Sequence, residues 1–290
     1  MSAATAQLLD GAAVAATIKR ELAEQIERLK AQGITPGLGT ILVGDDPASA
    51  TYVSLKHQDS NEIGIASFSE ELPVSATQAD VLAAIARFNA NPAIDAFLVQ
   101  LPLPHGLDEE AALLAVDFHK DVDGLHPVNL GRLALGKPGA LPCTPAGIQR
   151  LLVAYGVPIA GQHVVIVGRG VTVGRPLAML LSLKAEHANA AVTVVHTGVH
   201  DIGRFTRQAD ILVAAAGAPG TITADMVKPG AAVVGAGVTK EGKRVLSDLA
   251  DDVAGIAGWI TPRIGGVGPM TRAMLLSNTV RAAQARGGLA

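Results

Sequence analysis

The sequence predicts an α/β protein of two domains, the second being a doubly wound, Rossmann-type domain. The chain has 290 residues, which exceeds the size that one hydrophobic core usually organises. Apolar runs of strand length alternate with helical periodicity along most of it. Hydrophobic residues make up 49% and aromatic residues only 3%, so the apolar content is mainly aliphatic, as is typical of helices packed on parallel sheets.

The first half of the chain predicts helices and strands in alternation. Helical periodicity extends from Gly11 to Ala31, and the apolar run at residues 39–43 predicts a buried strand. Asp46 and Pro47 are typical of an N-cap and first turn, and they predict a helix over residues 48–62 that Gly64 ends. The next expected elements are a strand near Ser67, a helix over 77–89, a strand over 94–99 and a helix over 109–116.

The second half predicts a Rossmann arrangement after a connecting segment. Residues 117–141 are rich in Asp, Gly, Pro and His and show little periodicity, which predicts a loop or a connection between domains. Thr144 and Pro145 predict the N-cap and first turn of a helix that continues to Tyr155. Strands are expected at 163–167, 191–195, 211–215 and 231–235, separated by helical stretches, with a closing helix over 271–285.

Composition excludes several classes of function. The formal net charge of −3 leaves no basic excess to neutralise a phosphate backbone, so we expect no nucleic-acid partner. No apolar run reaches the roughly 18 residues of a membrane helix, and the N-terminus lacks the basic region of a signal peptide. The single cysteine, Cys143, excludes an internal disulfide. We expect a soluble cytoplasmic protein that acts on a small molecule.

A metal site is not expected either. The eight histidines show no paired ligand spacing, and one cysteine cannot form a multi-cysteine site. Asp121, Asp123 and Gly124 resemble the start of a calcium loop, but the downstream ligands are absent.

A glycine-rich loop predicts a dinucleotide site. The apolar run at 164–167 leads into Gly168, Arg169 and Gly170, then Gly174, and an apolar helix follows. Glycines allow close approach of a pyrophosphate, and the helix N-terminus supplies amide donors. The spacing departs by one residue from Gly-x-Gly-x-x-Gly, and an ordinary tight turn is the alternative.

The end of the following strand favours NADP over NAD. An NAD-specific fold usually places a carboxylate there to hold the ribose hydroxyls, but the strand at 191–195 leads into His196 and Thr197. Arg169 can reach a 2′-phosphate, and His196 and Thr197 are further donors. NADP is therefore the expected cofactor, and a merely solvated Arg169 is the alternative.

Tyr52 and Lys56 lie one helical turn apart in the first half. A Tyr-x-x-x-Lys pair is typical of dehydrogenases in which the lysine acidifies the tyrosine, but those enzymes carry the pair after the glycine loop. The order here is reversed, which indicates a separate leading domain. Taken alone, the pair is also compatible with the polar face of a surface helix.

Five ordered blocks, at residues 43–56, 99–104, 120–127, 142–145 and 265–271, together resemble the bifunctional methylenetetrahydrofolate dehydrogenase/cyclohydrolase family. The resemblance implies NADP-dependent oxidation of 5,10-methylenetetrahydrofolate to the methenyl cation and its hydrolysis to 10-formyltetrahydrofolate, in the one-carbon metabolism that serves purine biosynthesis. It also implies a homodimer. We assign residues 1–142 to a folate-binding catalytic domain, 143–270 to the NADP-binding domain and helix 271–290 to packing on the first domain, with folate expected in the cleft between the two.

The resemblance also implies roles for individual residues. Lys56 resembles the cyclohydrolase lysine, with Tyr52 and Gln100 as its hydrogen-bonding supports. Asp123 resembles the carboxylate that holds the pterin. The residues implied to line the folate pocket are Ser49, Gly266 and Pro269. Two positions depart from the family pattern, since Gly170 stands where many members have Ser and Ile264 where Pro is common.

Chemistry supports the role of Lys56, because attack of water on a cation needs a base, and both like charge and burial favour a neutral amine. Asp123 can accept two hydrogen bonds from an amino-amide edge, although Asp121 and Asp123 are also typical of a turn. Two alternatives stay open: a dehydrogenase of another small substrate that uses Tyr52 as proton donor, and a dinucleotide sensor without turnover.

Overall fold

The computed structural model describes residues 6–241 and 244–289, and these form two compact units. The three-stranded unit, named for its sheet, comprises Ala16–Cys143 and the chain from Arg272 onward. The six-stranded unit comprises the chain up to Ala15 and Thr144–Thr271. The first residues thus group with the second sheet, whereas the sequence assigned residues 1–142 to one domain.

The sheet of the three-stranded unit is parallel, in the order β3-β2-β4. In its register Ile41 lies between Glu70 and Val99. The strands are β2 (Gly37–Val43), β3 (Ala66–Leu72) and β4 (Ala96–Val99). The helices that contribute to this unit are α1 (Gly11–Lys30), α2 (Pro47–Ile63), α3 (Gln78–Ala90), α4 (Glu109–Ala115), α5 (Pro127–Ala134) and α9 (Val267–Arg286).

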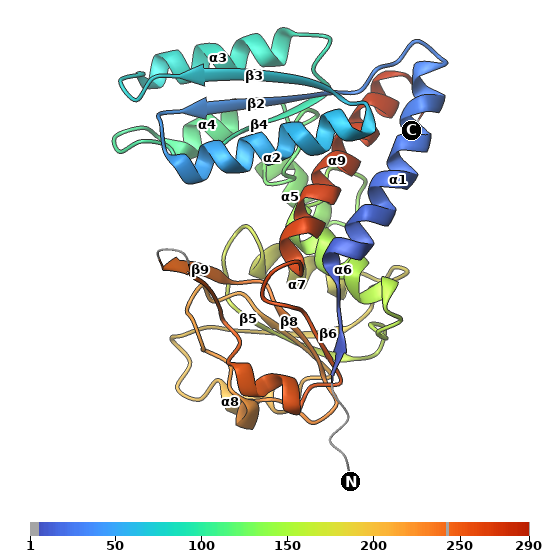
Figure 1. Ribbon diagram of the computed structural model, residues 1–290, viewed down its shortest axis with the longest axis vertical. Coiled ribbons are helices and arrows are strands. Elements are labelled where there is room, and N and C mark those ends of the chain that lie inside the picture. The colour runs from blue at the N-terminus through green and yellow to red at the C-terminus, as the bar shows by residue number, and fades with distance from the viewer. Residues whose placement is uncertain (1–5, 242–243, 290) are drawn as a thin grey trace. The chain divides into compact units, whose positions relative to one another are not determined.

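Helices cover both faces of this sheet. Successive side chains on a strand point to opposite faces. Thr40 hydrogen-bonds His57 of α2, whereas its neighbour Ile41 packs in a core cluster with Phe88 of α3 and Ala112 of α4. Helix α2 therefore covers one face, and α3 and α4 cover the other. Figure 1 shows α2 and α3 on opposite sides of the strands. Strands β2 and β4 are thereby shielded from water on both sides, whereas the edge strand β3 is only partly buried.

Helix α2 begins and ends where the sequence predicts. The Asp46 side chain accepts a hydrogen bond from the backbone of Ser49 at 2.8 Å, and Pro47 occupies the first helical position. Gly64 ends the helix with a φ of 86°, a left-handed conformation that glycine adopts without strain. Capping signals alone define this helix.

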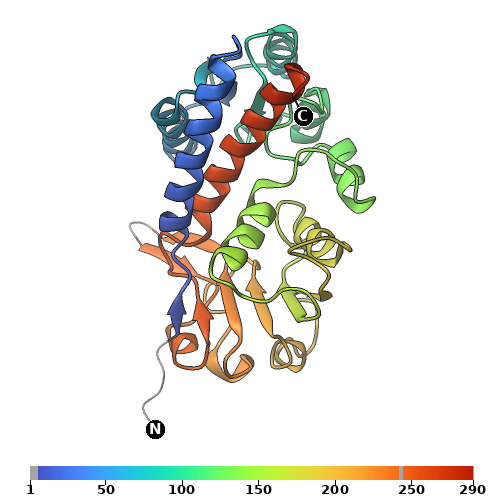
Figure 2. The same cartoon turned by 90° about the vertical axis from the view of Figure 1, so that its right-hand side faces the viewer.

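Two buried carboxylates connect the helices of the three-stranded unit. Asp59 of α2 pairs with Lys19 of α1 at 3.2 Å and with Arg272 of α9 at 2.6 Å. Asp95, just before β4, pairs with Arg286 at the end of α9. The Asp59 pairs join α1 and α9 to α2, the Asp95 pair joins α9 to the sheet, and Figure 2 shows α1 and α9 side by side.

The six-stranded unit has the expected Rossmann-type architecture. Its sheet runs β1-β11-β8-β7-β5-β6, and every pair is parallel. The strands are β1 (Gln7–Leu8), β5 (His163–Val167), β6 (Ala191–Val195), β7 (Ile211–Ala214), β8 (Ala232–Gly235) and β11 (Trp259–Ile260). The connecting helices are α6 (Cys143–Ala154), α7 (Gly174–Ser182), α8 (Gly203–Thr206), η1 (Ala224–Met226) and η2 (Asp251–Gly255), and a hairpin joins β9 (Val238–Glu241) to β10 (Arg244–Ser247).

Three sequence expectations differ from the structure. Residues 117–141 are not all loop, because α5 begins at Pro127 after an N-cap by the His126 ring, a capping residue that the pattern does not favour. Helix α6 begins at Cys143, one residue before the expected cap. Helix α9 begins at Val267, four residues early, because Gly268 and Pro269 fit a first turn, where helical amides need no partner within the helix.

Candidate active site

The structure brings Lys56 and Gln100 together. Lys56 lies half-buried on α2, and Gln100 follows the end of β4, where its backbone extends the pairing with Ile41. The Lys56 Nζ donates a hydrogen bond to Gln100 Oε1 at 3.0 Å. The Gln100 amide nitrogen in turn donates to the carbonyl of Leu101, which directs Oε1 toward the lysine. The lysine amine is thus held at the carboxyl edge of the three-stranded sheet.

Asp123 lies in a turn that Asp121 builds. The buried Asp121 carboxylate accepts hydrogen bonds from the backbones of Gly124 and His126 and from the side chain of Asn129. Gly124 has a φ of 70°, and a Cβ there would lie 2.4 Å from the carbonyl carbon of Leu141. Asp121 therefore has the turn-building role weighed from the sequence, and the turn positions Asp123.

The environment of Asp123 disfavours its charge. Burial raises the pKa of the Asp123 carboxyl, the positive charge of Lys56 lowers it, and the charge of Asp121 raises it, with a net rise. Because the charge of Lys56 affects the pKa of Asp123, the two side chains are close enough to interact electrostatically. A carboxylate in this position is stabilised by a ligand that offers N–H donors.

Tyr52 and Ser49 belong to the same helix as Lys56. Tyr52 is 45% exposed, one turn before the lysine, and Ser49 is buried in the first turn of α2. The backbone amide of Ser49 donates to the Asp46 side chain at 2.8 Å, so Ser49 lies at the capped start of the helix.

His57 and Cys143 support the site although the sequence did not single them out for it. The His57 ring lies between the hydroxyls of Thr40 and Ser67, which connects α2 to the sheet. Burial and the charge of Lys56 lower the pKa of His57, so the ring is neutral at neutral pH. The Cys143 thiol donates to the Val122 carbonyl at 3.3 Å, and burial raises its pKa well above the ordinary range, so it is not a nucleophile.

The glycine loop of the six-stranded unit packs closely against neighbouring backbone. Gly168 follows β5 with a φ of 134°, and a Cβ there would lie 2.1 Å from the Ala215 carbonyl oxygen. A Cβ at Gly174 would lie 2.1 Å from the Gly168 carbonyl oxygen. Helix α7 begins at Gly174 with no side-chain cap. In its first turn the Arg175 amide donates to the Gly170 carbonyl at 3.1 Å, and Pro176 has no amide hydrogen, so the sequence expectation of several free amides at this helix start is not met.

Other candidate cofactor residues lie at the same edge of this sheet. Arg169 and Gly170 are exposed in the loop after β5. His196 and Thr197 follow β6, which pairs directly with β5, and His196 Nδ1 accepts from the backbone of Gly198 at 3.1 Å. Carboxyl ends of parallel strands meet at one edge, so His196 and Thr197 lie at the edge of the sheet that carries the glycine loop.

Gly266 and Pro269 lie at the start of α9, in the part of the chain that belongs to the six-stranded unit. Gly266 is buried, and a Cβ there would lie 2.7 Å from the Pro262 carbonyl oxygen. Pro269 is partly buried in the first turn. Glycine is therefore required at position 266 by the local backbone alone.

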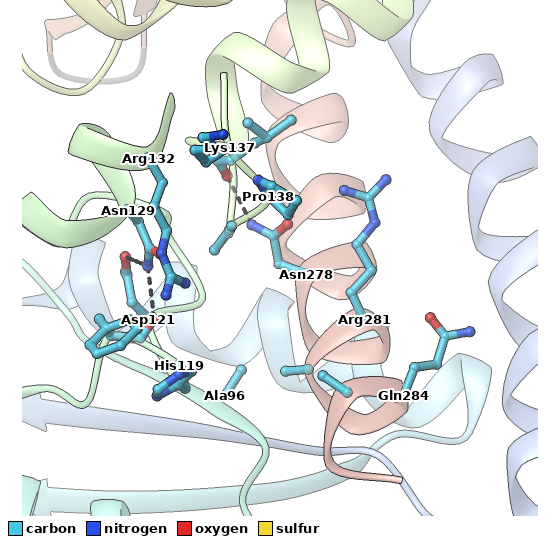
Figure 3. Close-up of a pocket in the computed structure, with 16 residues that line it drawn as sticks. Ala96, His119, Asp121, Asn129, Arg132, Lys137, Pro138, Asn278, Arg281 and Gln284 are labelled. Atoms are coloured by element: carbon cyan, nitrogen blue, oxygen red, sulfur yellow. Dashed lines mark hydrogen bonds between the residues drawn. The ribbon is translucent and has the colours of Figure 1, made fainter. Parts of the chain in front are cut away.

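A cavity of about 630 Å³ lies elsewhere in the three-stranded unit, between α5, the segment after it and α9. Figure 3 shows Arg132 and Arg281 on its walls and Asn129 directed at Asp121. None of the predicted site residues lines it. Within residues 6–241 and 244–289, no group of three or more His, Cys, Asp or Glu side chains could hold a metal, and no helix is long and apolar enough to cross a membrane.

Comparison with known proteins identifies the family. Residues 9–123 match the family described as tetrahydrofolate dehydrogenase/cyclohydrolase, catalytic domain, and residues 142–287 match its NAD(P)-binding domain. The chain belongs to the tetrahydrofolate dehydrogenase/cyclohydrolase family. This confirms the resemblance, and the matched NAD(P)-binding domain contains the glycine loop.

Members of the tetrahydrofolate dehydrogenase/cyclohydrolase family match over nearly the whole chain. The bifunctional protein FolD of Syntrophotalea carbinolica is 55% identical, with 97% of each chain covered. FolD from Campylobacter jejuni, a methylenetetrahydrofolate dehydrogenase/cyclohydrolase, has a similar crystal structure, with a TM-score of 0.93, 44% identity, and 97% and 99% of the two chains covered. The Trypanosoma brucei dehydrogenase-cyclohydrolase, solved with NADP and an inhibitor, has a TM-score of 0.91 and 40% identity, with 99% of each chain covered.

Proposed function

We propose that this protein oxidises 5,10-methylenetetrahydrofolate with NADP to 5,10-methenyltetrahydrofolate and hydrolyses that product to 10-formyltetrahydrofolate. The observation that carries the proposal is the Lys56–Gln100 hydrogen bond beside Asp123, in a chain whose two halves match the catalytic and NAD(P)-binding domains of this family. The comparisons favour neither the dehydrogenase of another substrate nor the sensor without turnover.

The hydrolysis assigns a task to each group near Lys56. Water attacks the carbon of the methenyl cation, and the neutral amine of Lys56 accepts the proton that the water loses, which gives a carbinolamine. The bond from that carbon to N5 then breaks as the hydroxyl proton leaves and N5 gains a proton, so the formyl group stays on N10. The cation itself disfavours an ammonium beside it, so substrate binding promotes the form that the reaction needs. Gln100 Oε1 holds the amine at 3.0 Å, and Tyr52, one turn earlier, supplies a hydroxyl for the same region.

The substrate is held by Asp123 in this proposal. Two N–H donors of the pterin's amino-amide edge satisfy the carboxylate that burial disfavours. Ser49, Gly266 and Pro269 are proposed as further lining of the folate site. Replacement of Asp123 by Ala is expected to weaken folate binding and both reactions, while normal folate affinity would refute this role.

The oxidation needs alignment rather than a base. When bound, NADP supplies the acceptor for the hydride that leaves the methylene carbon. Gly168, Gly170 and Gly174 admit the pyrophosphate, and Arg169 pairs with the 2′-phosphate, assisted by His196 and Thr197. NADP is preferred over NAD because no carboxylate follows β6.

The remaining parts of the proposal concern the molecule's setting. The three-stranded unit is the folate-binding domain and the six-stranded unit the NADP-binding domain, and the closing helix from Arg272 onward belongs to the former. The protein is a cytoplasmic homodimer, needs no metal, and supplies one-carbon units for purine biosynthesis. Light scattering of the purified protein is expected to give about twice the chain mass of 29.5 kDa.

A spectrophotometric assay of the purified protein tests the function. We expect NADP reduction that depends on methylenetetrahydrofolate, a smaller rate with NAD, and separate decay of added methenyltetrahydrofolate. Absence of NADP reduction would refute the dehydrogenase. Decay of the methenyl compound at the uncatalysed rate would refute the cyclohydrolase.

A further inference from the structure

Asp248 is a fully buried carboxylate in the six-stranded unit, directly after β10. Its Oδ2 accepts hydrogen bonds from the backbone amides of Ala216 at 2.7 Å and Gly217 at 3.0 Å. Its Oδ1 has no hydrogen-bond partner among the residues that the structure describes. Burial of a carboxylate with so little compensation costs free energy, so the position calls for a task that a side chain without an acceptor oxygen would not perform.

The amides that Asp248 holds belong to the loop directly beside the cofactor loop. The segment 215–217 follows β7, and the Ala215 amide donates to the carbonyl of Val167 at 2.7 Å. The Ala215 carbonyl oxygen lies so close to Gly168 that a Cβ there would approach it to 2.1 Å. Residues 215–217 therefore lie directly against the start of the glycine loop at Gly168, and we call this segment the wall of the cofactor loop.

Sheet topology indicates which half of the dinucleotide this wall faces. Strand β5 has β6 on one side and β7 on the other, so the chain reverses its winding direction at β5. Dinucleotides bind across such a switch point, with the adenosine ribose beside the strand that follows the glycine loop and its helix, which is β6 here. The loop after β7 then faces the nicotinamide half.

We propose that Asp248 is a positioning residue for hydride transfer: it fixes the amides of residues 216 and 217, and thereby the wall against which the nicotinamide half of the dinucleotide is aligned. This inference rests on the proposed NADP-dependent oxidation. It predicts that loss of the hydrogen bonds impairs oxidation without impairing hydrolysis, because hydrolysis uses no dinucleotide.

Two variants of Asp248 test the role of its oxygen atoms. Leucine has a similar shape but accepts no hydrogen bond, whereas asparagine keeps one oxygen that can accept from both amides. In Asp248→Leu, we expect dehydrogenase kcat/KM for NADP to fall about 10- to 100-fold, as loss of two hydrogen bonds implies. In Asp248→Asn, we expect most of the activity to be retained. Hydrolysis of methenyltetrahydrofolate should stay at the wild-type rate in both variants.

A matched pair of glycine variants tests the geometry and leaves the carboxylate in place. A Cβ at Gly237 would lie 1.9 Å from Asp248 Oδ2, whereas a Cβ at Gly255 would meet nothing within 4 Å. We expect Gly237→Ala to lose dehydrogenase activity selectively and Gly255→Ala to match the wild type. The two glycine variants therefore test whether the position of the Asp248 carboxylate affects oxidation, even if Asp248→Leu does not fold.

The inference would be overturned by oxidation at the wild-type rate in both Asp248→Leu and Gly237→Ala. It would also be overturned if Asp248→Leu and Asp248→Asn lost oxidation equally. A third contradicting outcome is an equal loss of oxidation and hydrolysis in Asp248→Leu or Gly237→Ala. A failure of the proposed function is distinguishable, because the wild-type protein would then not reduce NADP with methylenetetrahydrofolate at all.

Discussion

At the scale of single residues, Asp123 combines burial with a nearby like charge. Both raise its pKa above that of an unfolded chain, and the charge of Lys56 only partly offsets them. The folded state therefore binds more protons than the unfolded state between the two pKa values. Stability falls as the pH rises through that window and stays lower above it. The ionised Asp123 carboxylate thus lowers the stability of the ligand-free protein, because no ligand N–H groups are present to hydrogen-bond it.

Asp123→Asn is expected to raise the free energy of unfolding of the ligand-free protein at neutral pH, because the variant carries no buried charge at this position. The difference should vanish in acid, below the unfolded pKa of about 4, where both side chains are neutral. Urea unfolding at several pH values measures it. A variant less stable than the wild type at neutral pH would contradict the argument.

Sequence reasoning named Lys56, Gln100 and Asp123, and only the family resemblance implied that Gln100 hydrogen-bonds Lys56. The Lys56–Gln100 hydrogen bond joins residues 44 positions apart, and no local pattern encodes such a contact. The supports that it missed, such as the His57 ring between two strands, depend on side chains meeting across the sheet. Such contacts follow from the fold rather than from spacing.

At the scale of elements, the helices and strands with strong local signals were predicted and those made by tertiary pairing were not. The Asp46, Pro47 and Gly64 signals placed α2, and β5 and β6 have the predicted bounds. The two-residue strands β1 and β11 exist because they pair with each other, and β11 also with β8, which no short apolar run indicates. Helix α8, with four residues, is too short for periodicity to detect.

Helix α9 stabilises the turn that carries Asp123. Asn278 donates from its amide to the carbonyls of Val122 and Leu141, both at 2.9 Å. Asn278→Ala leaves the Leu141 carbonyl without this donor and the Val122 carbonyl with only the Cys143 thiol, so we expect a loss of about 1 to 3 kcal/mol in the free energy of unfolding. Gln284→Ala on the same helix is the control. Equal stability of the two variants in urea unfolding would show that α9 does not hold this turn.

The strand-to-helix turn after β5 gives a second prediction at this scale. In Gly168→Ala, the new Cβ meets the Ala215 carbonyl oxygen at 2.1 Å, so the turn must move. We expect the NADP affinity to fall about tenfold or more, equivalent to at least ~1.4 kcal/mol, by calorimetric titration. Gly131→Ala, where a Cβ meets nothing within 4 Å, should bind NADP normally. Normal affinity in Gly168→Ala would exclude this turn from cofactor binding.

At the scale of the whole molecule, the chain combines a three-stranded unit that contains Lys56, Gln100 and Asp123 with a six-stranded unit that contains the glycine loop. The α/β fold class was predictable because strands and helices alternate along both units. Each of these elements has a hydrophobic pattern that can be recognised within its own residues. Two reactions on one folate are expected to depend on different residues, so they should respond separately to substitution.

The most direct test of this account is the Lys56→Met variant, assayed with methylenetetrahydrofolate and NADP while NADPH and the methenyl compound are followed together. Gln58→Met, exposed on the same helix, is the control. We predict continued NADPH formation with accumulation of methenyltetrahydrofolate, because hydrolysis slows about 10²- to 10⁴-fold without its base. Hydrolysis at the wild-type rate in folded Lys56→Met protein would contradict the account.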